Sequence, residues 1–179
     1  MRVISGSARG RRLITLEDMN VRPTTDKVKE SLFNIIQFDV EGSNVLDLFA
    51  GSGQLGIEAL SRGARHCCFV DQSKQSLDVT KTNIKTCGFD HLSSVYKGDS
   101  LLFLDNTHEI FDIALLDPPY RQGLLEKSLL KLTDKMTKNG IIVCEASAEE
   151  TLPQEVNDFS ISREYKYGKI KLVVYKRNN

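Results

Sequence analysis

Short apolar runs alternate along this chain with segments whose apolar residues recur at helical spacing. The runs predict strands at 44–49, 66–70, 94–97, 111–116 and 141–144, and the segments between them predict helices at 55–60, 73–87 and 124–136. Strands that alternate with helices build a parallel sheet covered on both faces. Two further runs around Gly168, 159–166 and 169–176, predict an antiparallel hairpin. The predicted fold class is therefore α/β, with a mostly parallel seven-stranded sheet and a C-terminal antiparallel hairpin.

The length of 179 residues fits one domain, and 24 basic residues balance 24 acidic ones. The distribution is uneven, because residues 1–29 hold seven Lys and Arg against three acidic residues. We therefore expect a short basic arm over residues 1–23, built of extended and turn structure, within the same domain as residues 24–179. A helix is predicted to follow, with Thr24, Thr25 and Asp26 as its N-cap candidates. The arm predicts one local contact with an anionic partner, although a solvated charged segment would have the same composition.

Other function classes are disfavoured by what the chain lacks. No apolar run is long enough for a membrane span, and the first residues do not resemble a signal peptide. The four cysteines form no Cys-x-x-Cys pair, so we expect no metal site. Buried free thiols in a reducing cytoplasm are the simplest interpretation of this cysteine content.

A glycine loop follows the first predicted strand. Gly51, Gly53 and Gly56 have the spacing Gly-x-Gly-x-x-Gly, which permits a tight turn and brings the backbone close to a ligand. Asp71 ends the second predicted strand, where its carboxylate can accept hydrogen bonds from two ribose hydroxyls. Ligands bind at the carboxyl ends of the strands in such sheets. This part of the pattern suits a nicotinamide dinucleotide and S-adenosylmethionine equally.

Two further carboxylates favour S-adenosylmethionine. Asp47 lies inside the first strand, just ahead of the glycines, where its charge would attract a cationic amino group and repel a pyrophosphate. Asp99 follows the third strand and is placed to accept a hydrogen bond from an adenine amine. Asp99 also has the position of a turn or N-cap residue before the apolar run 101–104.

The tetrapeptide Asp117-Pro-Pro-Tyr120 follows the fourth predicted strand, and its prolines cannot continue a central strand. Asp117 and the carbonyl of Pro118 can each accept one N–H of an exocyclic amine, which exposes the nitrogen lone pair to a methyl donor. The ring of Tyr120 would stack on the target base. Because a paired base is out of reach, the target must be unpaired or flipped out.

These motifs together resemble a known class of enzyme. The segment 45–53 (Val-Leu-Asp-Leu-Phe-Ala-Gly-Ser-Gly) with Asp117-Pro-Pro-Tyr120 resembles class I S-adenosylmethionine-dependent amino-methyltransferases, which have a Rossmann-like fold. The segments 22–34 and 6–13 are similar to the RsmD family, the 16S ribosomal RNA guanine(966)-N2 methyltransferases. The resemblance covers nearly the whole chain. It implies methylation of the N2 amine of one guanine in 16S rRNA, within the small ribosomal subunit or its assembly intermediate. We also expect the enzyme to be cytoplasmic and monomeric and to hold no metal.

Carried onto this sequence, the resemblance implies three groups of residues. The target-amine site comprises Asp117, Pro118, Pro119 and Tyr120. The cofactor, S-adenosylmethionine, is held by Asp47, Phe49, Gly51, Gly53, Asp71 and Asp99. The RNA contacts are Arg9, Arg11, Arg12, Arg22 and Lys27.

Three alternatives remain open at this point. A DNA adenine-N6 methyltransferase uses the same Asp-Pro-Pro-Tyr chemistry, but the chain after Tyr120 holds only a predicted helix, strand and hairpin, with no room for a target-recognition domain. An NAD-binding oxidoreductase would need an acid or base for hydride transfer, and the three histidines occupy no motif. A non-catalytic RNA-binding module would have no need of the tetrapeptide.

Overall fold

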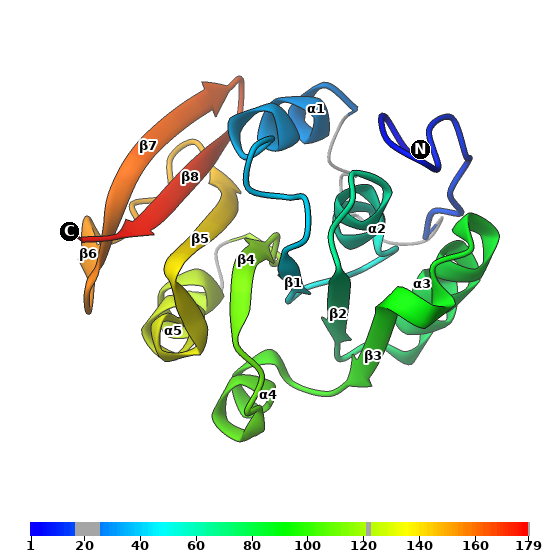
Figure 1. The fold of residues 1–179 in the computed structure, drawn as a ribbon. Helices are drawn as coiled ribbons and strands as arrows, with labels where there is room; N and C mark the ends of the chain where they lie inside the picture. Colours follow the sequence, from blue (N-terminus) through cyan, green and yellow to red (C-terminus); the bar gives the residue numbers. More distant parts are fainter. Residues whose placement is uncertain (17–25, 121–122, 179) are drawn as a thin grey trace.

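The computed structural model describes residues 1–16, 26–120 and 123–178. Its eight strands form one sheet in the order β3-β2-β1-β4-β5-β8-β7-β6 (Figure 1). Five strands are mutually parallel: β1 (Asn44–Asp47), β2 (His66–Asp71), β3 (Ser93–Lys97), β4 (Phe111–Leu116) and β5 (Met136–Ser147). Three antiparallel strands follow on the β5 side: β8 (Ile170–Arg177), β7 (Phe159–Tyr167) and β6 (Glu155–Val156). The seven predicted strands are confirmed, and the eighth is the two-residue edge strand β6.

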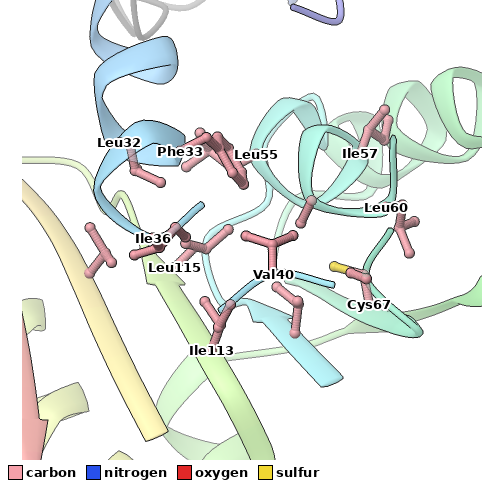
Figure 2. Close-up of a cluster of buried hydrophobic side chains, with 14 of the residues drawn as sticks. Leu32, Phe33, Ile36, Val40, Leu55, Ile57, Leu60, Cys67, Ile113 and Leu115 are labelled. Carbon is pink, nitrogen blue, oxygen red and sulfur yellow. The ribbon is translucent and has the colours of Figure 1, made fainter. Parts of the chain in front are cut away.

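Helices cover both faces of the sheet, as the alternating pattern predicts (Figure 1). They are α1 (Asp26–Ile35), α2 (Gln54–Ser61), α3 (Lys74–Cys87), α4 (Ser100–Asn106) and α5 (Leu124–Leu132), with short 3-10 turns η1 (Asp90–Leu92) and η2 (Thr133–Lys135). Helices α1, α2 and α3 pack on one face, and α4 and α5 pack on the other. Figure 2 shows Leu32 and Phe33 of α1 in the same buried cluster as Leu55 of α2 and Leu115 of β4. We call this the α1–α3 face of the sheet.

Two helix predictions need correction. The helix predicted over 124–136 ends at Leu132, because the chain tightens into η2 and Met136 already pairs with Phe111 in the sheet. The apolar run 101–104 forms α4, a helix that the alternation did not predict. Its N-cap is Asp99, whose Oδ1 accepts hydrogen bonds from the backbone of Leu101 (2.9 Å) and Leu102 (3.0 Å).

The arm folds back on itself and packs against the α1–α3 face. The N–H of Val3 donates to the carbonyl of Arg11 (2.9 Å), and the N–H of Gly10 donates to the carbonyl of Val3 (2.9 Å). Val3, Ala8 and Leu13 are buried in the cluster that also contains α2. The expected extended and turn structure is confirmed for residues 1–16, while the expected boundary at residue 23 and the N-cap candidates Thr24 and Thr25 lie outside the described residues.

A buried carboxylate in α2 fixes the arm. Glu58 is fully buried, and its two oxygens accept hydrogen bonds from the N–H groups of Ile4 (2.8 Å) and Ser5 (3.0 Å). The ammonium of Lys29 lies 3.9 Å from the same carboxylate and donates to the carbonyl of Arg2 (2.6 Å). Burial lowers the pKa of the Lys29 ammonium, and the charge of Glu58 opposes this shift. At Gly6, whose φ is +84°, an added Cβ would lie 1.7 Å from the carbonyl oxygen of Ser61, so the arm fits only with glycine there.

Candidate active site

The glycine loop connects β1 to α2 at the carboxyl edge of the sheet. Gly51 and Gly53 have φ angles of +57° and +79°, which favour glycine. Gly56 lies in the first turn of α2, where a Cβ would approach the ring of Phe69 to 2.3 Å and the sulfur of Cys67 to 2.6 Å. The first two glycines therefore shape the turn, and the third allows α2 to pack closely on β2, as in dinucleotide-binding loops.

Asp71, at the end of β2, holds this loop. Its Oδ2 accepts a hydrogen bond from the N–H of Gly51 (2.9 Å), and its Oδ1 accepts one from the N–H of Ser73 (2.8 Å). Each carboxylate oxygen can accept a further hydrogen bond, so these contacts are compatible with the predicted ribose contacts. The structure therefore gives Asp71 a loop-holding function that the sequence did not predict.

Asp47 lies beneath the loop. Its side chain is buried, and its Oδ2 accepts a hydrogen bond from the N–H of Gly56 (2.9 Å). Burial raises the pKa of the Asp47 carboxyl from its ordinary 3.8 to about 7, the nearby charge of Asp71 adds to the rise, and the Gly56 hydrogen bond opposes it. A buried carboxylate with a raised pKa is stabilised by a cation placed next to it, which fits the amino group of S-adenosylmethionine.

The raised pKa of Asp47 predicts a pH-dependent stability. Because the folded chain binds this proton more tightly than the unfolded chain, the Asp47 contribution to the free energy of unfolding falls as the pH rises from about 4 to 7, and it stays reduced above pH 7. Asp47→Asn keeps an acceptor for Gly56 but cannot ionise. We expect the variant to gain stability relative to wild type across this window, by up to about 4 kcal/mol at pH 8.

Chemical denaturation at pH 4, 6 and 8 without cofactor measures this difference. Asp78→Asn, at an exposed position of α3, is the matched control and should leave the wild-type pH profile unchanged. Parallel profiles for wild type and Asp47→Asn would contradict the assignment of the raised pKa.

Two polar residues of α3 also belong to the loop, and the sequence analysis missed both. The hydroxyl of Thr80 donates to the carbonyl of Gly51 (2.8 Å). Asn83 is fully buried, and its amide donates to the carbonyls of Ser52 (2.9 Å) and Ile14 (3.0 Å) while accepting from the N–H of Ile14 (2.8 Å). One side chain thereby joins the arm to the glycine loop. Polar residues on the inward side of a predicted helix were the available signal.

Asp99 and Phe49, the other two predicted cofactor residues, lie at the carboxyl edge of the sheet or next to it. Asp99 follows β3 and is the N-cap of α4, which confirms its predicted position as an N-cap residue. Its contact with adenine stays a prediction. Phe49 follows β1, is half-buried, and packs against the apolar cluster beneath α4 and α5.

Asp117-Pro-Pro-Tyr120 begins immediately after β4. Pro118 is buried, whereas Pro119 and Tyr120 are exposed. The last parallel pair of β4 and β5 is Leu116 with Cys144, so the next residues along the two strands, Asp117 and Glu145, are neighbours at the carboxyl edge. The structure therefore places the tetrapeptide at the edge that carries the glycine loop.

Glu145 is a site residue that the sequence analysis missed. Its side chain is buried, and its Oε1 accepts a hydrogen bond from the hydroxyl of Tyr120 (2.8 Å). A carboxylate inside an otherwise apolar strand, 141–146, was the available signal, because buried acidic residues need partners. The hydroxyl of Tyr120 thus has an anchoring contact in addition to the ring that was expected to stack.

The predicted RNA contacts that the structure describes lie on the arm and at the start of α1. Arg9, Arg11 and Arg12 are exposed on the arm, and Lys27 is exposed on α1. Arg22 lies outside the described residues. Among the residues that the structure describes, no helix has the length and apolar character needed to span a membrane.

The sheet order and the residues at its carboxyl edge define a class. Five parallel strands in the order 3-2-1-4-5, an antiparallel hairpin beside the fifth, a glycine loop after the first and an Asp-Pro-Pro-Tyr segment after the fourth are the features of a Rossmann-like methyltransferase.

Comparisons with known proteins identify the family within this class. The family described as Conserved hypothetical protein 95 matches residues 1–176. The Bacillus subtilis (strain 168) protein YlbH is 44% identical over 183 residues, a match that covers 99% of each chain. Ribosomal RNA small subunit methyltransferase D of Escherichia coli (strain K12) is 33% identical, and the match covers 99% of this chain and 90% of that protein. The solved structure of the Escherichia coli protein yhhF superposes with a TM-score of 0.89 at 33% identity, covering 99% of this chain and 98% of that one.

This chain belongs to that family, which confirms the resemblance inferred from residues 6–13, 22–34, 45–53 and 117–120. The Haemophilus influenzae protein HI0767 has a similar structure, with a TM-score of 0.84 at 31% identity.

Proposed function

We propose that this chain transfers the methyl group of S-adenosylmethionine to the exocyclic N2 amine of a guanine in 16S rRNA, at the position numbered 966 in the family name. The observation that carries the proposal is the Asp117-Pro-Pro-Tyr120 segment at the end of β4, on the sheet edge that holds the glycine loop. Family membership supports the substrate class, because a relative that matches 99% of this chain is named ribosomal RNA small subunit methyltransferase D.

The residues at the sheet edge fit S-adenosylmethionine. Asp47 offers a buried carboxylate to the amino group, Asp71 offers an acceptor to the ribose hydroxyls, and Asp99 offers its second oxygen to the adenine amine. A Cβ built at Gly51 would meet no atom within 4 Å, so space for a ligand lies over the loop. Phe49 and Gly53 complete the proposed set of cofactor residues.

The tetrapeptide would activate the amine. S-adenosylmethionine supplies an electrophilic methyl group when it is bound. Asp117 accepts one N–H of the amine, and the carbonyl of Pro118, which lies beyond the last β4–β5 pair, accepts the other. These two contacts orient the nitrogen lone pair toward the methyl group, and the Asp117 carboxylate stabilises the positive charge that develops on nitrogen. Pro119 holds the turn, and the Tyr120 ring stacks on the flipped base.

The RNA would reach this site from a small ribosomal subunit or its assembly intermediate. The exposed arginines of the arm, Arg9, Arg11 and Arg12, and Lys27 of α1 would contact its phosphates, as would Arg22. We propose that the enzyme acts as a monomer in the cytoplasm, where its substrate is assembled.

Mapping the methylated nucleotide tests this function. The purified protein is incubated with S-adenosylmethionine and small-subunit particles from cells that lack the gene, and the rRNA is digested and analysed by mass spectrometry. We expect one N2-methylguanosine in 16S rRNA. Methylation of adenine, of DNA, or of no nucleic acid would overturn the proposal, and binding of NAD in place of S-adenosylmethionine in equilibrium dialysis would favour the oxidoreductase.

The contact between Tyr120 and Glu145 gives a prediction about the target site. Tyr120→Phe keeps the stacking ring but removes the donor to a buried carboxylate, a hydrogen bond worth roughly 1.5–3 kcal/mol. We expect kcat/KM for the RNA substrate to fall about tenfold, with the Kd for S-adenosylmethionine unchanged. Tyr120→Ala should cost more, because it also removes the ring.

A double-mutant cycle separates this contact from a general loss of packing. Combining Tyr120→Phe with Glu145→Met, which removes the acceptor at a similar side-chain length, should cost no more than the worse single substitution, because each removes the same hydrogen bond. Fully additive losses in kcat/KM would show that Glu145 does not act through Tyr120.

A further inference from the structure

The hairpin formed by β7 and β8 concentrates positive charge that the proposed function does not use. Residues 159–177 contain six Lys and Arg and one acidic residue, Glu164. Residues 30–158 hold 20 acidic and 11 basic residues. The hairpin is therefore a second basic segment on an otherwise acidic chain.

Part of this charge has a structural function. The ammonium of Lys171 is buried and lies 3.1 Å from Glu164. The guanidinium of Arg177 pairs with Asp158 and lies over the ring of Phe159, 4.7 Å from its centroid. Arg163 and Lys169, in contrast, are exposed and make no ion pair within the part of the chain that the structure describes.

The turn of the hairpin lies at the carboxyl edge of the sheet. Ser147, the last residue of β5, pairs with Ile170, and the carbonyl of Lys169 accepts a hydrogen bond from Ala148 (2.9 Å). Gly168 and Lys169 form the two-residue turn between the paired residues Tyr167 and Ile170. Glu145, which contacts Tyr120, lies two residues before Ser147 on β5, so the turn is next to the target-amine site.

A row of hairpin side chains faces the same side as that site. Tyr165 and Tyr167 are half-buried and pack against the cluster of the α1–α3 face. Strand alternation places Arg163 on this face too, and its guanidinium donates to the hydroxyl of Tyr165 (3.2 Å). Alternation also places Glu145 on this face, because Val143 belongs to the same cluster. We call Arg163, Tyr165 and Tyr167, together with Lys169 in the adjoining turn, the hairpin row.

We propose that the hairpin row is a second RNA-binding surface, which holds the strand next to the flipped guanine. Arginine and lysine neutralise phosphates, and partly exposed tyrosine rings provide stacking surfaces for bases. The arm packs on α2 and α3, beside β1 to β3, whereas the hairpin lies beyond β5 in the sheet order (Figure 1). In the sheet order, the target site at the ends of β4 and β5 therefore lies between two basic segments. This inference rests on the proposed function.

The double substitution Arg163→Ala/Lys169→Ala tests the hairpin row. Two phosphate contacts are removed, so the slope of log Kd against log salt for small-subunit particles should flatten by about 1.4–1.8, which is 0.7–0.9 per contact. We expect the affinity for particles near 0.1 M salt to fall at least tenfold, with the Kd for S-adenosylmethionine and the thermal midpoint unchanged. The matched control Lys127→Ala/Lys138→Ala removes two exposed lysines from α5 and from the opposite end of β5, and should bind as wild type.

Equal affinity and equal salt slope for wild type and Arg163→Ala/Lys169→Ala would overturn the proposal. The two charges would then serve only to protect the sheet edge against aggregation. Loss of affinity for heparin without loss for particles would overturn it as well. The two proposals fail separately: wild-type protein that methylates no guanine defeats the proposed function, whereas the hairpin row is judged by particle binding alone.

Discussion

Asp117→Asn is expected to lower the rate of methyl transfer by about 10²–10³-fold, the range seen when one preorganised electrostatic partner is removed. The asparagine has a similar shape and still offers an oxygen, but it lacks the charge that faces the developing ammonium. Pro118 keeps its carbonyl at the site. Single-turnover methylation of small-subunit particles measures the effect directly, because it isolates the transfer step from product release.

The cofactor should bind this variant normally, since the proposed cofactor residues lie on other strands. Calorimetry with S-adenosylmethionine checks this point. Asp134→Asn, at an exposed position in η2, also removes one negative charge but lies away from the site, so it should retain full activity. A fully active Asp117→Asn enzyme would show that the carboxylate does not act on the amine.

Asp71→Ala is expected to raise the Kd for S-adenosylmethionine by about 100-fold. The sequence predicts the loss of ribose contacts, and the structure adds the loss of the acceptors for Gly51 and Ser73. A hydrogen bond to a charged group is worth roughly 1.5–3 kcal/mol, so the loss of one ribose contact together with loosening of the glycine loop accounts for this magnitude. Calorimetric titration of the free enzyme measures it.

Asp71→Asn separates the two functions of this residue, because the amide can accept from one backbone N–H but carries no charge. We expect its Kd for S-adenosylmethionine to lie between the values for wild type and Asp71→Ala. Asp39→Ala, an exposed position after α1, serves as the control and should not change the affinity. Unchanged affinity in Asp71→Ala would rule out both the ribose contact and the loop-holding function.

Local sequence was sufficient to predict the strands, the glycine loop and the carboxylates that follow it. Strands β1, β2 and β4 are short apolar runs buried on both faces, so their existence depends on their own residues. Gly51 and Gly53 are needed for backbone angles within the loop itself, and Asp71 and Asp117 are placed at the carboxyl edge because they end their strands. The helix predicted over 124–136 ends at Leu132 instead. The prediction was wrong because the end of this helix depends on the pairing of Met136 with Phe111 in the sheet.

The contacts that join distant segments were decided by the tertiary structure. Asn83 connects Ile14 to Ser52, and Glu58 binds the backbone at Ile4 and Ser5, across separations of 31 to 69 residues. The meeting of Tyr120 with Glu145 follows from the register of β4 and β5. Hydrophobic periodicity specifies which face of an element is buried but does not specify the register or the partner element. The sequence by itself therefore determined the fold class and which polar residues lie at the strand ends. Only the packing of helices and strands decided which buried polar groups hold the glycine loop, the arm and Tyr120 in place.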